Sequence, residues 1–150
     1  MKRRALDFDN DYEQLLAAQR LSWKINFPGQ RFSESVFRVS LRAGAQRGEI
    51  QVYEVEDELI GWLWLQVKSR RVRGHVKHIQ VEESHWGEGW GRRIMLDAIA
   101  MCVDRGCRAV TLNVTKSNAR AMALYTNLGF VVAEQQGTRQ RMRLGLPRKP

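Results

Sequence analysis

The chain has 150 residues, of which 43% are hydrophobic and 27% are charged, a balance typical of a folded globular domain. This composition excludes wholesale disorder, and no apolar run reaches the roughly 18 residues that a membrane-spanning helix needs. The 25 lysines and arginines against 16 acidic residues give a net charge of +9, which attracts anions.

Several features favour one cytoplasmic domain over residues 1–150. The sequence contains no repeat, low-complexity tract or linker, and no apolar stretch follows the basic N-terminus, so no secretory signal is expected. Cys102 and Cys107 have neither a second pair nor a histidine cluster near them. They therefore predict neither a disulfide scaffold nor a zinc site, and we expect no metal.

The first third of the chain predicts two helices. Asn10 and Glu13 have the spacing of a capping box, and apolar residues follow them at helical intervals. Segment 24–32 contains a Pro-Gly pair and predicts a loop. Ser33 is placed to cap a second helix, which we expect to run to about Ala45.

Three strands are predicted next. Residues 49–55 and 59–67 form a hairpin whose second strand is apolar on both faces and therefore central, with Trp62 and Trp64 in the core. The third strand, 75–81, breaks strict alternation of apolar and polar residues. A β-bulge near Lys77 would restore one apolar face, and the alternative is a strand with partly polar faces.

A glycine-rich turn follows this strand at Gly87-Glu88-Gly89-Trp90-Gly91 and leads into a helix that should end near Gly106. Glycines at the start of a helix let backbone amides approach an anion, and the helix dipole favours negative charge there. The spacing is neither that of a Walker A loop nor that of a dinucleotide-binding fingerprint. A tight turn without a ligand is the alternative.

The last third predicts a strand, a helix and a hairpin. The strand is 109–115, the helix runs over 118–127 and ends at Gly129, and the hairpin turns across Gly137. The resulting order is α–α–β–β–β–α–β–α–β–β, which indicates a mixed sheet with helices on both faces.

Two segments resemble motifs of the GNAT superfamily of N-acetyltransferases. The first is similar to that family's acetyl-CoA-binding motif and reads V-x-E-x-x-W-G-E-G-W-G-R-R-I-M over 81–95. The second is similar to its second motif and reads L-N-V-x-x-x-N-x-x-A-x-x-L-Y-x-x-x-G-F over 112–130. The predicted order of elements agrees with the family fold over nearly the whole chain.

The resemblance implies a mixed α/β fold of about six to seven strands, splayed between the fourth and fifth, with about four flanking helices. It also implies direct transfer of an acetyl group from acetyl-CoA to a primary amine in a ternary complex. Tyr125 would be the general acid that protonates the leaving thiolate, or alternatively an aromatic packed on Phe130. The implied cofactor-binding residues are Ile79, Val81, Trp86, Gly87, Glu88, Gly89, Trp90, Gly91, Arg92, Asn113, Asn118, Ala121 and Tyr125.

The sequence departs from the family pattern at three places. Trp86 stands where arginine or glutamine is usual, and Glu83 replaces a proline. The carboxylate that many members use as a base is absent, because the corresponding positions are Asn113 and Lys77-His78. His78 and Glu83 are the candidate bases, although His78 is also compatible with a plain strand histidine, and Glu82 or water could serve instead.

The resemblance implies an amine-bearing small molecule or protein as the acceptor, and Phe27 and Arg31 in the first loop are candidates to bind it. The tight last hairpin lacks the long tyrosine-bearing loop of ribosomal-protein acetylases, which disfavours a peptide N-terminus. Neither a membrane nor nucleic acid is an expected partner, despite the basic run Lys68–Arg73, and a homodimer is left open. The alternative function is an acyl-CoA-binding or partner-docking module without catalysis.

Overall fold

The computed structural model describes residues 1–68 and 72–148, so residues 69–71 of the predicted basic run lie outside it. The described chain forms helices and strands in an order close to the predicted one. The helices are α1 (Phe8–Asn26), α2 (Glu34–Gln46), α3 (Trp90–Asp104) and α4 (Ala119–Asn127), with a 3-10 turn η1 (Glu83–His85). The strands are β1 (Lys2–Ala5), β2 (Ile50–Val55), β3 (Glu58–Lys68), β4 (Arg73–Val81), β5 (Ala109–Thr115), β6 (Val131–Gln136) and β7 (Arg139–Gly145).

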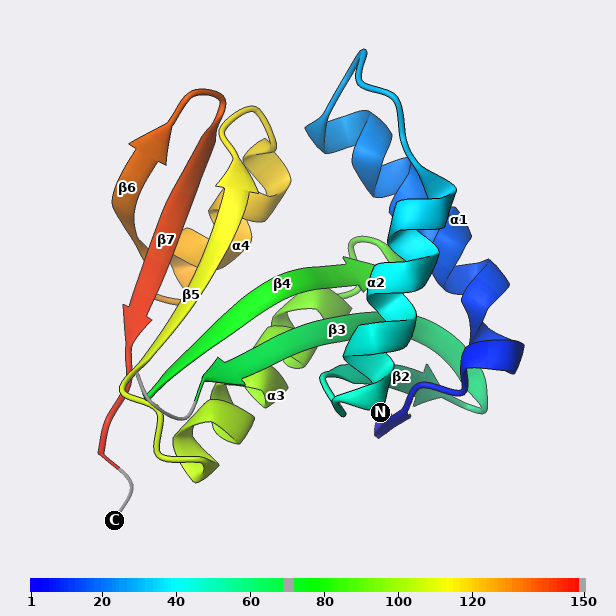
Figure 1. The fold of residues 1–150 in the computed structure, drawn as a ribbon. Coiled ribbons are helices and arrows are strands. Elements are labelled where there is room, and N and C mark those ends of the chain that lie inside the picture. The colour runs from blue at the N-terminus through cyan, green and yellow to red at the C-terminus, as the bar shows by residue number, and fades with distance from the viewer. Residues whose placement is uncertain (69–71, 149–150) are drawn as a thin grey trace. The chain divides into compact units, whose positions relative to one another are not determined.

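The strands form one mixed sheet in the order β1-β2-β3-β4-β5-β7-β6 (Figure 1). β4 and β5 are parallel, and α3 supplies the crossover that a parallel pair requires. Their pairs run from Arg73–Ala109 to Val76–Leu112, although β4 continues to Val81 and β5 to Thr115. The mixed α/β class with four flanking helices is thereby confirmed for the described residues.

Contacts group the chain into two compact units. The first unit contains Met1–Trp64 and His78–Ile94, and the second contains Leu65–Lys77 and Met95–Pro150. Each unit is described by itself below, and the single domain 1–150 remains a prediction. Among the described residues, no helix is long and apolar enough to cross a membrane.

The first unit has an aromatic core between its helices and its strands. Tyr12 of α1 and Phe37 of α2 stack with ring centroids 6.3 Å apart, and Phe37 meets the edge of Trp62 at 6.2 Å. Trp62 and Trp64 are each only 1% exposed, which confirms their predicted place in the core. Burying such large rings supplies much of the driving force for this packing.

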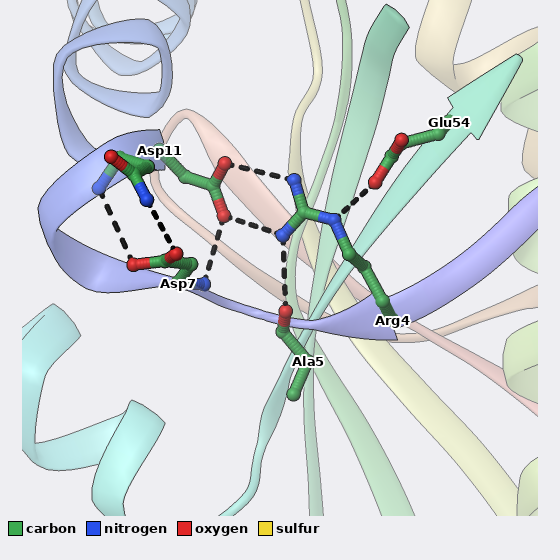
Figure 2. A network of polar contacts seen from close by, with 6 residues as sticks. Arg4, Ala5, Asp7, Asp11 and Glu54 are labelled. Carbon is green, nitrogen blue, oxygen red and sulfur yellow. Dashed lines mark hydrogen bonds and ion pairs between the residues drawn. The ribbon is translucent and has the colours of Figure 1, made fainter. Parts of the chain in front are cut away.

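The start of the chain contains a strand that the sequence did not predict. β1 pairs antiparallel with β2, and Arg4 of β1 forms ion pairs with Asp11 of α1 and Glu54 of β2 (Figure 2). The Arg4–Asp11 contact is bidentate, at 2.7 and 2.9 Å, and Asp11 is 5% exposed. We name Arg4, Asp11 and Glu54 the Arg4 clamp.

The predicted capping box at Asn10 and Glu13 is wrong by three residues. Asp7 is the N-cap of α1: its side chain accepts from the Asn10 amide, and its own amide donates to Asp11. The helix then continues to Asn26, into the segment predicted as loop. The cap of α2 at Ser33 is confirmed.

The second unit is built on β5, which lies between β4 and β7. One face of β5 is apolar and buried, as Val110, Leu112 and Val114 show. Gly74 of β4 lies so close to Cys102 of α3 that a side chain there would collide with the sulfur. The glycine therefore permits close packing of α3 on β4.

Candidate active site

The turn that precedes α3 has the backbone of an anion site. Gly87 and Gly89 have positive φ angles of 82° and 86°, a left-handed conformation that glycine adopts without strain. The Arg93 amide makes the helical bond to the Gly89 carbonyl at 3.2 Å. The amides of Trp90, Gly91 and Arg92 precede it, in the first helical turn, and are left for another acceptor.

Two side chains of this turn add to its capacity for a negatively charged group. The indole nitrogen of Trp90 is buried and has no hydrogen-bond partner among the described residues. A buried unpaired N–H costs free energy, so an added acceptor would stabilise it. The guanidinium of Arg93 lies 4.8 Å from the centre of the Trp90 ring and supplies positive charge beside it.

Glu88 places a carboxylate in the same turn, and His85 partly offsets it. The His85 Nδ1 atom is 2.8 Å from Glu88, and its Nε2 atom is 3.2 Å from Glu58. The hydrogen bonds to Glu58 and to Glu88 raise the pKa of His85 above its ordinary value. When it is protonated, His85 offsets the negative charge of Glu88 toward an anion in the turn.

Trp86 lies between β4 and the turn and is hydrogen-bonded to the end of β4. Its indole N–H donates to the Val81 carbonyl at 2.8 Å, and the backbone N–H of Glu82 donates to Ile60 of β3 at 2.8 Å. Trp86 thus contacts the end of β4 from the position where the family pattern has arginine or glutamine. The Val81 amide and Ile79 lie on the half-buried end of β4.

Lys77 of β4 is exposed and the four residues after it are half-buried, so burial does not alternate along this strand. The irregularity agrees with a bulge near Lys77, which remains a prediction. His78 lies against the rings of Trp62 and Trp64, at 5.5 and 5.7 Å between centroids. Glu83, the other candidate base, is exposed at the start of η1.

Tyr125 lies in the second unit, on α4. It is 8% exposed, and its ring contacts Phe130 with the centroids 5.9 Å apart. Burial raises the pKa of Tyr125 to about 12, while the smaller effect of the positive charge of Arg139 acts in the opposite direction. A phenol with this pKa stays protonated at neutral pH and is able to donate a proton.

The other predicted residues of the second unit have structural contacts of their own. Asn118 caps α4, since its side-chain oxygen accepts from the Ala121 amide at 3.2 Å. Asn113 is exposed on β5, and its carbonyl accepts from Arg139 at 3.3 Å. Arg139 also donates to Thr115, and its place beside β5 could not be predicted, because a helix and a strand separate β5 from β7 in the sequence.

The candidate acceptor residues lie in the loop after α1, in the first unit. Phe27 packs on Trp23 with ring centroids 4.5 Å apart, and the Trp23 indole donates to the Gln30 carbonyl. Arg31 is exposed. Within the described part of the chain, no three histidine, cysteine or acidic side chains are grouped as a metal ion would require.

The sequence interpretation missed a hollow in the second unit. It has a volume of about 170 Å³ and is open to solvent beside β4 and β5. We name it the basic hollow, and its lining residues are Gln66, Lys68, Arg73, His75, Thr111, Asn113 and Arg141. Basic residues at every second position, as in Arg73-x-His75-x-Lys77 and Arg139-x-Arg141-x-Arg143, were the available signal.

Comparison with known proteins agrees with these features. Residues 12–130 match the profile of the acetyltransferase (GNAT) family. Over 102 residues the chain is 34% identical to the 5-NmdU N-acetyltransferase of Pseudomonas phage PaMx11, covering 68% of this chain and 70% of that protein. Over 150 residues it is 29% identical to the mycothiol acetyltransferase of Amycolatopsis mediterranei (strain U-32), covering 80% of this chain.

The chain spans about half or less of the length of the mycothiol acetyltransferases that it matches. Among solved structures, it is similar to the PaiA N-acetyltransferase of Thermoplasma acidophilum in complex with coenzyme A, with a TM-score of 0.81. That match has 19% identity and covers 97% of this chain and 98% of the other, so it establishes the fold alone.

Proposed function

The chain belongs to the acetyltransferase (GNAT) family, and on that premise we propose that it transfers the acetyl group of acetyl-CoA to a primary amine. The observation that carries the proposal is the turn at Gly87–Gly91, with left-handed glycines at the start of α3. Backbone amides in this arrangement suit a pyrophosphate, which is one of the charged groups of acetyl-CoA.

In this proposal, the residues of the turn bind the pyrophosphate of acetyl-CoA, and the end of β4 positions its thioester. The amides of Gly87 to Arg92 hold the pyrophosphate, and the Trp90 indole and Arg93 add a donor and a charge. The backbone N–H of Val81 donates to the thioester carbonyl and stabilises the negative charge that develops on its oxygen. Asn118 and Ala121 at the start of α4, together with Asn113, bind the remainder of the cofactor.

The chemical step requires three proton movements. The amine nitrogen attacks the thioester carbon, a C–N bond forms, the C–S bond breaks, and the nitrogen loses its surplus proton to solvent. Tyr125 gives its phenolic proton to the departing thiolate and regains a proton from solvent. The ammonium form of the acceptor first loses a proton to His78, to Glu83 or to water.

The acceptor is a small molecule or a protein that carries a primary amine, and Phe27 and Arg31 contact it in our proposal. The relatives named above include enzymes whose names indicate different acceptors, so the name of one relative does not select a substrate. A single domain acting in the cytoplasm, without a metal, completes the proposal.

The direct test is release of free CoA thiol from acetyl-CoA in the presence of a panel of amines. The panel contains nucleoside, sugar, amino-acid and peptide amines, and mass spectrometry identifies the acetylated product. We expect turnover well above background with at least one class. Tight binding of acetyl-CoA without turnover of any amine would instead support a docking module.

A further inference from the structure

The basic hollow is a second feature that points to a ligand. Its cations come from three strands: Lys68 from β3, Arg73 from β4 and Arg141 from β7, all in the second unit. The sheet pairing explains why residues far apart in sequence meet here, since His75 pairs with Thr111 and Asn113 pairs with Arg141. Its volume of about 170 Å³ admits several water molecules.

The charged side chains that line the hollow are all positive among the described residues. Lys68, Arg73 and Arg141 line it, and no carboxylate does so among the described lining residues. The ion-pair partner of Arg141 is Glu134, at 3.5 Å, and both side chains are substantially exposed. Such a pair is weak in water, so it leaves Arg141 able to bind another anion.

Neutral hydrogen-bonding groups complete the lining. The Thr111 hydroxyl is 2.8 Å from His75 Nδ1, and the Asn113 and Gln66 amides border the same space. Burial, followed by the charges of Arg73, Arg141, Lys68 and Lys77, lowers the pKa of His75 to about 4. His75 is therefore neutral at pH 7, and its pKa depends on the positive charge that surrounds it.

We propose that the basic hollow binds a compact oxyanion, namely the phosphate group of a small metabolite or inorganic phosphate. Arginines recognise phosphate through paired N–H donors, and convergence of cations from three strands suits one localised charge. The proposal does not rest on the Gly87–Gly91 turn, because no residue of that turn lines the hollow, and Asn113 is the one described lining residue that the hollow shares with the proposed cofactor site.

Nucleic acid fits the hollow less well than a compact anion does. A single strand needs an extended basic track with aromatic rings on which bases stack. The described lining contains no phenylalanine, tyrosine or tryptophan, and the cations surround one concave space. An oligonucleotide therefore serves as the competing ligand in the test.

The test measures the imidazole pKa of His75 by NMR, with the signal assigned from a His75→Gln variant. The probes are inorganic phosphate, glycerol 3-phosphate and a short DNA oligonucleotide, at constant ionic strength. A bound oxyanion offsets the surrounding cations, so phosphate or glycerol 3-phosphate should raise this pKa by about one unit. Comparison of these two probes distinguishes the free ion from a monoester.

Variants locate the site. Arg73→Gln and Arg141→Gln should each weaken binding of the effective probe about tenfold, as expected when a charged hydrogen bond is lost. Arg148→Gln removes the same charge from an exposed position that does not line the hollow, and it should leave affinity unchanged. The proposal is overturned if neither phosphate probe moves the His75 signal, if only the oligonucleotide does so, or if the three variants behave alike.

Discussion

Burial of the Tyr125 hydroxyl on α4 has a direct chemical consequence. The ordinary phenol pKa of about 10 rises to about 12 here, because the ionised form would lose its hydration. In the proposed mechanism this residue donates a proton to a thiolate, so it must be protonated at the working pH. Its environment satisfies that condition well beyond neutral pH.

Tyr125→Phe should lower kcat about 100-fold, within the usual range for loss of a general acid, while leaving the affinity for acetyl-CoA unchanged. Because the pKa of Tyr125 is raised to about 12, its ionisation should cause no fall in wild-type rate up to about pH 10. Steady-state rates against pH and calorimetric titration with acetyl-CoA measure both quantities.

The matched control for this prediction is Phe130→Leu, which alters the ring contact and keeps the hydroxyl. We expect this variant to change kcat less than about threefold, since the Tyr125 hydroxyl that donates the proton is still present. Equal rates for Tyr125→Phe and wild type at every pH would show that Tyr125 is only a packed aromatic.

At the scale of elements, the Arg4 clamp joins three segments of the first unit: β1, α1 and β2 (Figure 2). Burial raises the pKa of Asp11, but hydrogen bonds from Arg4 and from the Asp7 amide outweigh it and hold the pKa below its ordinary value. A carboxylate with a lowered pKa stabilises the fold above its unfolded pKa of about 4. That stability is lost as the pH falls through the folded value.

Asp11→Asn should lower stability at pH 7 by about 2 kcal/mol, because it removes the bidentate charged contact to Arg4, which keeps Glu54 as a partner. For a chain of this size that corresponds to a fall in Tm of roughly 4–8 °C. Below about pH 4 the difference from wild type should shrink, since protonation removes the same charge. Thermal melts between pH 2 and pH 7 measure it.

Asp9→Asn is the control for this prediction, because Asp9 is exposed in the same helical turn. It should change Tm by no more than about 2 °C, as expected at an exposed site. If the Tm difference between Asp11→Asn and wild type stayed constant down to pH 2, protonation of Asp11 would not be linked to stability.

At the scale of the whole molecule, the sequence predicted the elements whose signals are local. The Ser33 cap and the Gly87–Gly91 turn each depend on a few neighbouring residues, and the structure contains both. The cap of α4 at Asn118 was not predicted. The order of elements from α1 onward and the core position of Trp62 also followed from local patterns.

Features that depend on distant contacts could not be predicted in this way. β1 is a four-residue strand, Lys-Arg-Arg-Ala, without an apolar pattern, and it is held by pairing with β2 and by the Arg4 clamp. The basic hollow likewise takes its cations from three strands. Only the sheet register brings Asn113 and Arg141 together.

The measurement that tests the central claim most directly is a thermal melt with and without acetyl-CoA, at about 100 times its Kd. Binding to the folded state alone adds about 2.7 kcal/mol at that concentration, a rise in Tm of roughly 5–10 °C. Wild type is compared with Gly89→Val and Gly137→Val. Both glycines have positive φ, 86° and 60°, with open space around an added Cβ, so each variant places a side chain on a left-handed residue without a steric clash.

We predict that acetyl-CoA raises the Tm of wild type and of Gly137→Val, whereas Gly89→Val loses most of the shift because its side chain blocks approach of phosphate to the backbone. No shift in wild type, or an undiminished shift in Gly89→Val, would contradict the assignment of the Gly87–Gly91 turn as the pyrophosphate site.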